Sequence, residues 1–253
     1  MGNVLIMAGG ESSRMKQSTG ESLHKALTTV FDIPLIELNI LYSYLYGFEK
    51  IWVSISSSET ELIEYVKDLK QLYEERFQIQ IKLIIEKIPL GTIGAVQFVE
   101  CNSEPLLILF VDNILDLDLT ALVASHLSAH AYITVASHVE PFKMPFGELV
   151  VSDTTIINYI EKPIYKILIS SGTYVLNYEV RNFIRKEFYN KRLDVHNLTK
   201  ILIDQSRPIH SYFHQAIWVD INDKATLLRT RDMQQWPVMQ KIINIRNEFV
   251  SSK

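Results

Sequence analysis

The chain of 253 residues contains a single cysteine, Cys101, which excludes an intramolecular disulfide framework and a cysteine-based zinc site. Its formal net charge of −4 gives no general attraction for nucleic acid or anionic lipid, so any phosphate binding must be local. Its first apolar run, NVLIM, is too short for a signal peptide or a membrane span, and no uncharged stretch of spanning length follows. We therefore expect a cytoplasmic protein that binds neither nucleic acid nor membranes.

Nearly half of the residues, 47%, are hydrophobic, which is enough for one large core. In the first half of the chain, apolar runs of strand length alternate with helical segments, a pattern typical of βαβ units. The runs are continuous rather than alternating, which predicts that helices cover both faces of the sheet. The sequence thus favours an α/β protein with a Rossmann-like, three-layer α/β/α fold and a mostly parallel, mixed central sheet.

We expect strands at Val4–Met7, Lys50–Ile55, Ile79–Ile85, Pro105–Phe110 and Ala131–Ala136, and helices at Pro34–Tyr46, Glu59–Leu72, Thr92–Val99 and Leu119–Ala129. After Pro141 the pattern changes. Phe146–Val151 and Thr154–Glu161 indicate a hairpin, and Ser170–Leu176 a further strand, all expected to extend the same sheet. Two helices should follow, one capped by Asp223 and one over Trp236–Phe249 that packs on the core or on a second subunit.

The first strand ends in small residues, Ala8, Gly9 and Gly10, followed by Arg14 and later by Lys25. Glycines let backbone N–H groups approach a phosphate closely, and an arginine and a lysine supply positive charge. The segment matches neither the P-loop pattern nor the dinucleotide-binding pattern. Taken alone, the glycine pair fits an ordinary turn between a strand and a helix better than a phosphate-binding loop.

Further polar residues follow later strands of the expected sheet, and ligands of open α/β sheets bind at the carboxyl ends of strands. Glu86 follows the third expected strand and precedes Gly91 and Thr92, while Asp112 follows the fourth. Later come Glu161-Lys162-Pro163 and a short run, residues 216–219, that ends in Asp220. Carboxylates, lysines and small residues should therefore gather at one edge of the sheet.

In this order the segments resemble the sugar nucleotidyltransferases, which join a nucleoside triphosphate to a sugar 1-phosphate. Residues 7–15 and 24–30 are similar to the family signature LAGGxGTRxxPLT…PKALxPV. The later segments IPLGTIGAV, LFVDNIL, IEKP, SSGTYVLN and WVDI resemble the family's PLGTAGAL, its strand ending in NGD, its EKP, its NAGxYVxN and its WxDIGTP. The resemblance extends from about Val4 to Leu228.

The resemblance implies a direct in-line transfer in which the sugar phosphate attacks the α-phosphorus and pyrophosphate leaves. Asp112 and Asp220 would bind Mg²⁺, a hard cation commonly held by one or two carboxylates and phosphate oxygens. Arg14 would hold the β- and γ-phosphates, Lys25 would neutralise charge near the α-phosphate, and Lys162 would bind the sugar phosphate. As ordinary alternatives, both aspartates fit a turn or a helix cap, and both lysines fit a solvated surface.

The remaining roles also follow from the resemblance. Ala8, Gly9, Gly10, Glu86, Gly91 and Thr92 would contact the nucleotide, and Gly147, Glu161, Lys162 and Gly172 the sugar phosphate. Glu86 favours GTP, because two carboxylate oxygens fit the paired N1–H and N2–H₂ donors of guanine; an exposed glutamate at a strand end is the alternative.

The whole chain, 1–253, should form one nucleotidyltransferase domain. Its nucleotide-binding half would cover about 1–112, its sugar-phosphate half about 113–230 and its C-terminal helix about 231–250, and a homo-oligomer fits the amphipathic tail. The sequence departs from the family pattern at Ser12, Ser13, His24, residues 110–111 and residues 222–224. These departures leave open a second function, that of a non-catalytic regulator or sensor that binds a nucleotide sugar without making it.

Overall fold

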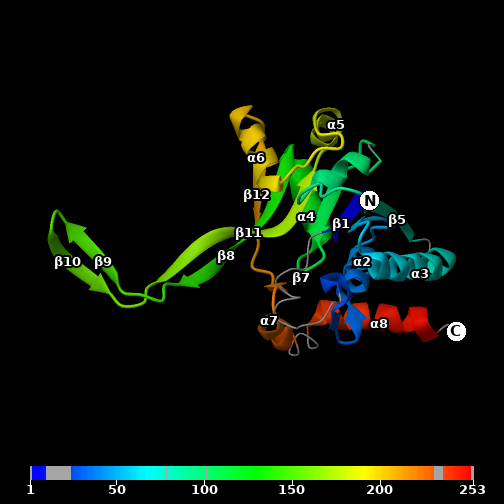
Figure 1. Ribbon diagram of the computed structural model, residues 1–253, viewed down its shortest axis with the longest axis horizontal. Coiled ribbons are helices and arrows are strands. Elements are labelled where there is room, and N and C mark those ends of the chain that lie inside the picture. Colours follow the sequence, from blue (N-terminus) through cyan, green and yellow to red (C-terminus); the bar gives the residue numbers. More distant parts are fainter. Residues whose placement is uncertain (1, 10–23, 78, 101, 231–235, 252–253) are drawn as a thin grey trace.

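The computed structural model describes residues 2–9, 24–77, 79–100, 102–230 and 236–251. A seven-stranded sheet of order β12-β8-β11-β6-β1-β4-β5 forms its centre (Figure 1). Its strands are β1 (Asn3–Met7), β4 (Lys50–Ser56), β5 (Gln80–Glu86), β6 (Leu106–Phe110), β8 (Ile133–Lys143), β11 (Ile164–Leu176) and β12 (Ile209–Phe213). Neighbouring strands are parallel except at β11, which runs antiparallel to both β6 and β8, so the sheet is mixed and mostly parallel, as predicted.

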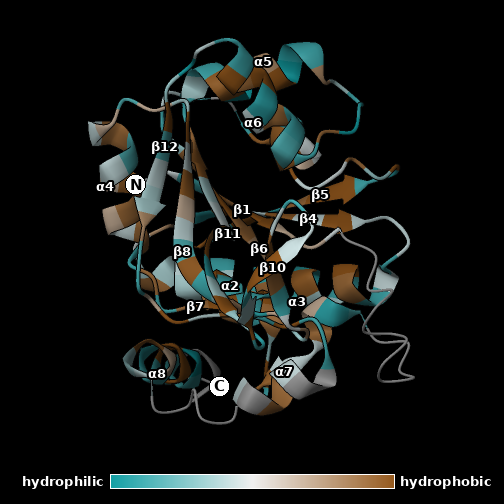
Figure 2. Ribbon diagram, turned by 90° about the vertical axis from the view of Figure 1, so that its left-hand side faces the viewer, coloured by the Kyte–Doolittle hydropathy of each residue, from teal (hydrophilic) through white to brown (hydrophobic). Residues whose placement is uncertain are grey.

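Helices cover both faces of this sheet (Figure 2). One face packs against α2 (Leu35–Leu45), α3 (Thr60–Phe77), α4 (Leu119–Ser128) and α8 (Pro237–Ser251), and the other against the 3₁₀ helix η2 (Gly94–Phe98), α5 (Tyr178–Glu187) and α6 (Val195–Asp204). Val4 and Ile6 of β1 lie in the first core, whereas Leu5 and Met7 lie in the second. Both faces of the strand are buried, and this is why the run is apolar throughout. The three-layer α/β/α fold is confirmed.

Most elements of the first half match their predicted positions to within a few residues. The segment Thr92–Val99 differs, since it forms the short 3₁₀ helix η2. The C-terminal helix α8 packs on the core, where Val238, Met239 and Ile242 are buried and Arg246 pairs with Glu37 of α2 at 2.8 Å. Smaller elements complete the described chain: η1 (Lys25–Leu27), β2 (Thr29–Val30), β3 (Ile33–Pro34), β7 (Asn113–Leu115), β13 (Trp218–Asp220) and α7 (Lys224–Arg229).

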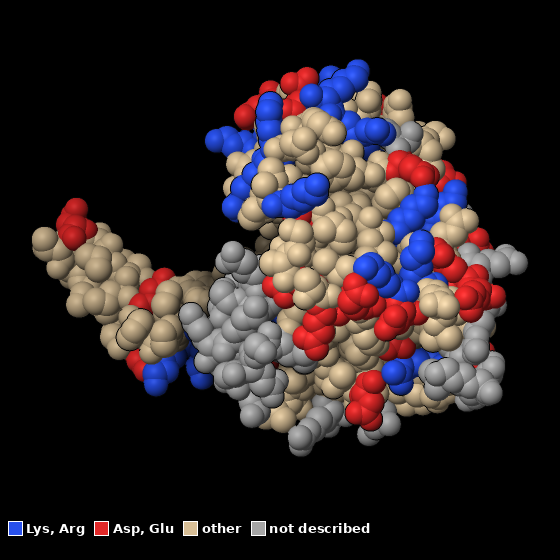
Figure 3. Space-filling view, turned by 45° about the vertical axis from the view of Figure 1, so that its right-hand side comes forward, with Lys and Arg blue, Asp and Glu red and all other residues tan. Residues whose placement is uncertain are grey.

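The predicted hairpin exists, but it does not extend the central sheet. Its strands β9 (Glu148–Ser152) and β10 (Thr155–Ile160) form a two-stranded sheet of their own. They lie at the end of an arm, residues 138–170, because β8 and β11 remain paired with each other from Ser137 and Ser170 out to Lys143 and Ile164. The arm projects from the body, and much of its visible surface is uncharged (Figures 1 and 3). The expectation that this hairpin extends the central sheet was therefore wrong, whereas Ser170–Leu176 lies in that sheet as part of β11, as predicted.

Among the helices of the described residues, none combines the length and the apolar character that crossing a membrane requires.

Candidate functional site

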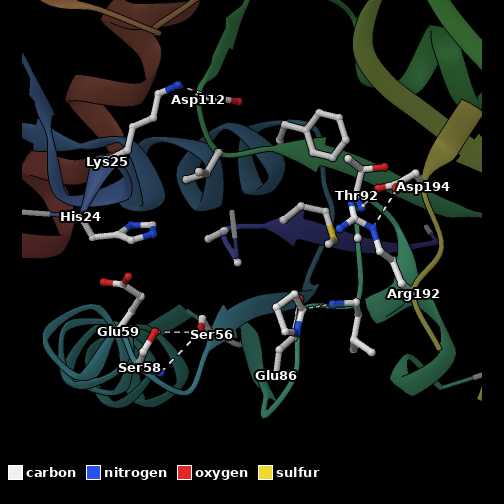
Figure 4. Close-up of a pocket in the computed structure, with 18 of the residues that line it drawn as sticks. His24, Lys25, Ser56, Ser58, Glu59, Glu86, Thr92, Asp112, Arg192 and Asp194 are labelled. Carbon is white, nitrogen blue, oxygen red and sulfur yellow. Dashed lines mark hydrogen bonds and ion pairs between the residues drawn. The ribbon is translucent and has the colours of Figure 1, made fainter. Parts of the chain in front are cut away.

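A pocket of about 640 Å³ opens where β1, β5 and β6 end (Figure 4). Because these strands are parallel, their carboxyl ends meet at one edge, which is where ligands of open α/β sheets bind. The residues lining it include many of those singled out in the sequence: Ala8, Gly9, Lys25, Glu86, Gly91, Thr92 and Asp112. The edge of small and charged residues that the sequence predicts thus forms a real concavity.

Lys25 occupies one end of the pocket, with its ammonium group held by two residues from distant parts of the chain. Its Nζ lies 2.8 Å from Oδ2 of Asp112 and 2.8 Å from Oδ1 of Asn222. Lys25 begins η1, which His24 caps by accepting a hydrogen bond from the N–H of Ala26 at 3.1 Å. A buried cap thus fixes the turn, and this turn directs the lysine at the carboxylate (Figure 4).

Asp220 lies beside Asp112 because of a short antiparallel pairing between β13 and β7. Asp220 pairs with Asn113, the residue after Asp112, and the N–H of Ile221 donates to the backbone oxygen of Asp112 at 2.9 Å. Two aspartates separated by more than a hundred residues in sequence therefore lie on neighbouring backbone segments; Asp112 lines the pocket, whereas Asp220 is not among its lining residues. The amide of Asn222 donates to Asp220 Oδ2, which adds a further oxygen-bearing side chain to the group.

The donor set of this corner suits Mg²⁺. It offers two carboxylates and an amide oxygen, all hard ligands, and Mg²⁺ typically uses one or two carboxylates and keeps several water or phosphate ligands. The described residues contain no group of three or more His, Cys, Asp or Glu side chains arranged for a metal, so an all-protein cage of that kind is absent from them. Asp112 and Asp220 thus carry the type of ligand that a magnesium ion takes.

Glu86 is buried on the wall of the pocket, with 6% of its surface exposed, and not at an exposed strand end. Its Oε1 accepts from the hydroxyl of Ser54 at 2.5 Å, and its Oε2 accepts from the N–H of Leu90 at 3.1 Å. The carboxylate therefore fastens the loop after β5 to β4. Each oxygen retains a second lone pair for a ligand donor.

The loop at Gly91 and Thr92 is held by residues that the sequence analysis did not single out. Gly91 has φ +82°, and a Cβ there would lie 2.7 Å from the backbone oxygen of Leu193, so the position requires glycine. Asp194 accepts from the N–H of Thr92 at 2.9 Å and pairs with Arg192 at 3.0 Å. Arg192 and Asp194 precede α6 and reach the pocket only through tertiary packing, which leaves no local sequence signal for them.

Among the described residues, five predicted site residues do not line the pocket: Gly147, Glu161, Lys162, Gly172 and Asp220. Gly10, Arg14 and the departures at Ser12 and Ser13 lie outside the described residues. Gly147, Glu161 and Lys162 are on the arm, where Glu161 and Lys162 form an exposed pair at 3.8 Å. The structure therefore does not place Gly147, Glu161 and Lys162 in the pocket with Lys25 and Asp112.

Gly172 lies at the base of the arm, in the irregularity where β11 passes from β8 to β6. Its φ is +70°, and a Cβ there would collide with the side-chain amide of Asn113. Glycine at this position is thus required by backbone geometry and close packing.

Solved structures resemble this fold at low sequence identity. HddC from Yersinia pseudotuberculosis, in the complex with GMP-PN, matches with a TM-score of 0.69 and 21% identity, covering 93% of this chain and 100% of that chain. A putative glucose-1-phosphate thymidylyltransferase from Bacillus anthracis matches with a TM-score of 0.68 and 17% identity, covering 92% and 95%. At such identities the likeness shows the fold.

Curated relatives match over most of the chain. A UTP–glucose-1-phosphate uridylyltransferase of Synechocystis is 26% identical over 239 residues, which are 86% of this chain and 59% of the relative. A mannose-1-phosphate guanyltransferase of Yarrowia lipolytica is 24% identical over 232 residues, 88% of this chain and 61% of the relative. A D-glycero-alpha-D-manno-heptose 1-phosphate guanylyltransferase of Campylobacter jejuni is 26% identical over 182 residues, 71% of this chain and 77% of the relative.

The chain thus spans about three-fifths of the length of the first two of these relatives. The family model described as nucleotidyl transferase matches residues 3–233, which include β1, the pocket, the arm and the β7–β13 pairing. Because this match takes in nearly the whole chain, the chain belongs to the nucleotidyl transferase family.

Proposed function

We propose that this protein transfers a nucleoside monophosphate from a nucleoside triphosphate to a sugar 1-phosphate, giving a nucleotide sugar and pyrophosphate. The observation that carries the proposal is the group formed by Lys25, Asp112 and Asn222 at one end of a pocket at the carboxyl ends of parallel strands, with Asp220 hydrogen-bonded to Asn222. Such a group combines a mobile cation with carboxylates that suit a metal, which phosphoryl chemistry needs more than an acid or a base.

In the proposed reaction the acceptor phosphate oxygen forms a bond to the α-phosphorus as the bond to the β-phosphate oxygen breaks in line. The nucleophile is already an anion, so no side chain has to remove a proton from it. Lys25 stabilises the negative charge that develops around the α-phosphate. We propose from the resemblance that Arg14 binds the departing pyrophosphate and that Lys162 binds the acceptor phosphate.

Asp112 and Asp220 would hold Mg²⁺ through carboxylate oxygens. When bound there, the ion would neutralise phosphate charge and orient the phosphates for in-line attack. Lys25 lies 2.8 Å from Asp112 Oδ2, so its ammonium group also balances the charge of this carboxylate.

We further propose GTP as the donor. Glu86 lines the pocket, and each of its oxygens has one intramolecular donor and capacity for a second. Guanine offers two adjacent N–H donors in the geometry that a carboxylate accepts. The relatives named above include a protein named for UTP and two named as guanylyl or guanyl transferases, so the choice of base needs a direct test.

We also propose that the chain acts as one nucleotidyltransferase domain and associates with itself through the arm. Large apolar side chains stand exposed along the arm, among them Phe142 at 54%, Ile157 at 62% and Leu168 at 57% exposure. Contiguous exposed apolar surface of this kind is typical of protein interfaces, and most soluble oligomers are formed by identical chains.

Pyrophosphate release tests the proposed function. The assay combines Mg²⁺ and each of GTP, dTTP, UTP, CTP and ATP with a panel of hexose and heptose 1-phosphates. Release with one donor and one acceptor would support the transfer and identify both substrates. Nucleotide binding by thermal shift without release from any pair would favour the alternative, a nucleotide-sugar sensor.

A further inference from the structure

A second hollow, of about 440 Å³, lies at the base of the arm and shares no lining residue with the first pocket. We call it the histidine pocket. Its lining comes from β8, β12, β13 and the loop between the last two: His138, Val139, Glu140, Phe213, His214, Gln215, Ala216 and Trp218. None of these residues has a role in the transfer described above.

The histidine pocket contains two imidazole rings joined by one buried hydroxyl group. The Oγ of Ser171 lies 2.8 Å from Nδ1 of His138 and 2.7 Å from Nε2 of His214, and Ser171 is fully buried. A serine hydroxyl has a single hydrogen, so it donates to one ring and accepts from the other. Of the two ring nitrogens that face Ser171, one therefore carries a proton and the other does not.

The outer nitrogens of the two rings consequently have opposite character when both rings are neutral. If His138 donates to Ser171, its Nε2 is an acceptor and Nδ1 of His214 is a donor; in the other arrangement the roles are exchanged. Both residues are 7% exposed, and neither outer nitrogen makes a hydrogen bond of ordinary geometry among the described residues. The groups near them are Glu140, beside Nε2 of His138, and the backbone of Ala216, beside His214. A ligand hydroxyl group could therefore complete the hydrogen bonding of the pair.

The neutral form of His214 is favoured here. Burial and the neighbouring His138 ring lower the pKa of His214, and the ring centroids are 5.5 Å apart, so two positive charges at this spacing would repel. Glu140 Oε2 lies 3.4 Å from Nε2 of His138. A carboxylate at this position disfavours an anionic ligand, whereas hydroxyl groups, which both donate and accept, match the two rings and the carboxylate together.

Trp218 gives the pocket an aromatic wall. Its ring lies 4.8 Å from His138, and its indole N–H donates to the backbone oxygen of Ser171 at 2.9 Å, so the polar edge of the ring is already used. The remaining apolar surface suits the C–H face of a sugar ring or a polyol chain.

The position of the histidine pocket relates it to the transfer site. Trp218 and Asp220 are two residues apart on β13 and lie on the same face, so their Cα atoms are roughly 6–7 Å apart. The backbone oxygen of Ser171 also accepts from the side chain of Asn113 at 3.2 Å, the residue after Asp112. The histidine pocket therefore adjoins the strands that carry Asp220 and the residue after Asp112, so an acceptor whose phosphate lies beside Lys25 would have its hydroxyl groups near this pocket.

We propose that His138 and His214 recognise neutral hydroxyl groups on the body of the acceptor, against the face of Trp218, and so select a sugar or polyol phosphate without a second acidic group. This inference rests on the proposed function for its acceptor, but the binding it describes does not require turnover.

The first experiment measures the binding of the hexose and heptose 1-phosphates by calorimetry in the absence of nucleotide. It compares the unmodified chain with H214F and H138Q, and with the control H210F. His210 also bonds a serine, Ser125, at 3.0 Å, but does not line the histidine pocket. We expect H214F and H138Q to weaken the binding of the preferred acceptor at least tenfold, with H210F unchanged. Equal affinities in all four chains, or no binding to the unmodified chain, would overturn the inference.

The second experiment uses acceptors that lack one hydroxyl group. The unmodified chain should lose affinity for one such deoxy analogue, and H214F should no longer distinguish it from the parent compound, which a merely structural role of His214 would not produce. Melting temperatures show whether each variant folds. If H214F does not fold, the comparison with the deoxy analogue is made with H138Q. If H138Q releases pyrophosphate and still distinguishes the deoxy analogue from the parent compound, the role of the histidine pocket is refuted and the proposed transfer stands. If acceptor binding depends on His214 but no pyrophosphate is released, the role of the pocket stands and the proposed transfer is refuted.

Discussion

The ammonium group of Lys25 lies 2.8 Å from a carboxylate oxygen of Asp112, 87 positions later in the chain. The two side chains are 12% and 31% exposed, so water screens their attraction only in part. Each also belongs to an element fixed by other contacts, η1 for Lys25 and the β6–β7 turn for Asp112. The pair therefore sets the position of a cation and an anion before any ligand is bound.

Replacing Asp112 by Asn should abolish magnesium-dependent pyrophosphate release, with a loss of about a hundredfold or more, because the variant lacks the charge that holds the ion. The assay is release at saturating substrates. The matched control is D68N, since Asp68 is exposed on α3 and does not line the pocket. An unaltered rate in D112N would refute the metal assignment.

Replacing Glu86 by Gln should lower both stability and base preference. One of the two oxygens becomes an NH₂ group, which cannot accept from both Ser54 and Leu90, so a buried donor loses its partner at a cost of about 1–3 kcal/mol. Chemical denaturation measures this cost. If Glu86 reads guanine, the ratio of kcat/KM for GTP to that for UTP should fall in the same variant; a constant ratio would leave Glu86 with its structural role alone.

The stability of the fold should decrease between about pH 6.5 and pH 4 because of His126. Burial, and then the nearby His210, lower the pKa of His126 from 6.5 to about 4, and its Nδ1 is 2.8 Å from the hydroxyl of Thr134. Below pH 6.5 the unfolded chain binds a proton that the folded chain does not, so stability present above that pH is lost as the pH falls, by up to about 3 kcal/mol.

Denaturation curves at several pH values in H126Q, which keeps a polar side chain near Thr134, check this expectation. The variant should lose much of the slope between pH 6.5 and 4. An identical slope would show that other groups cause it.

Removing apolar side chains from the arm should reduce self-association. We expect the unmodified chain to form an oligomer in light scattering, and the triple variant F142S/I157S/L168S to shift towards the monomer at the same concentration. The control is L127S, a residue that is 55% exposed on α4, away from the arm. A monomeric unmodified chain would contradict the proposal.

The sequence allowed most of the nucleotide half to be predicted, because its signals are local. A continuous apolar run such as β1 is recognisable by itself, and the residue after it lies at the carboxyl edge wherever the strand lies in a parallel sheet. Helix α5 also carried a signal that was overlooked, since Asn177 accepts from the N–H of Val180 as a helix cap, and Val180 and Ile184 share one face.

The rest depends on contacts that no local pattern contains. The hairpin β9–β10 was recognised as a hairpin, but its separation from the central sheet follows from the long pairing of β8 with β11. Arg192 enters the pocket because the loop before α6 crosses Gly91, and His138 meets His214 because β12 lies beside β8. Such encounters are set by topology.

Strand β11 lies partly in the buried sheet and partly in the arm, and the rate of amide hydrogen exchange should differ between these two parts. Its C-terminal residues, from Tyr174 to Leu176, lie between β6 and β8 in the buried sheet, so their amides should exchange only when the whole fold opens. From Ile164 to Leu168 the strand pairs with β8 alone and is exposed, so local opening of the arm should suffice there. A single strand will then report two opening free energies, that of the body and that of the arm.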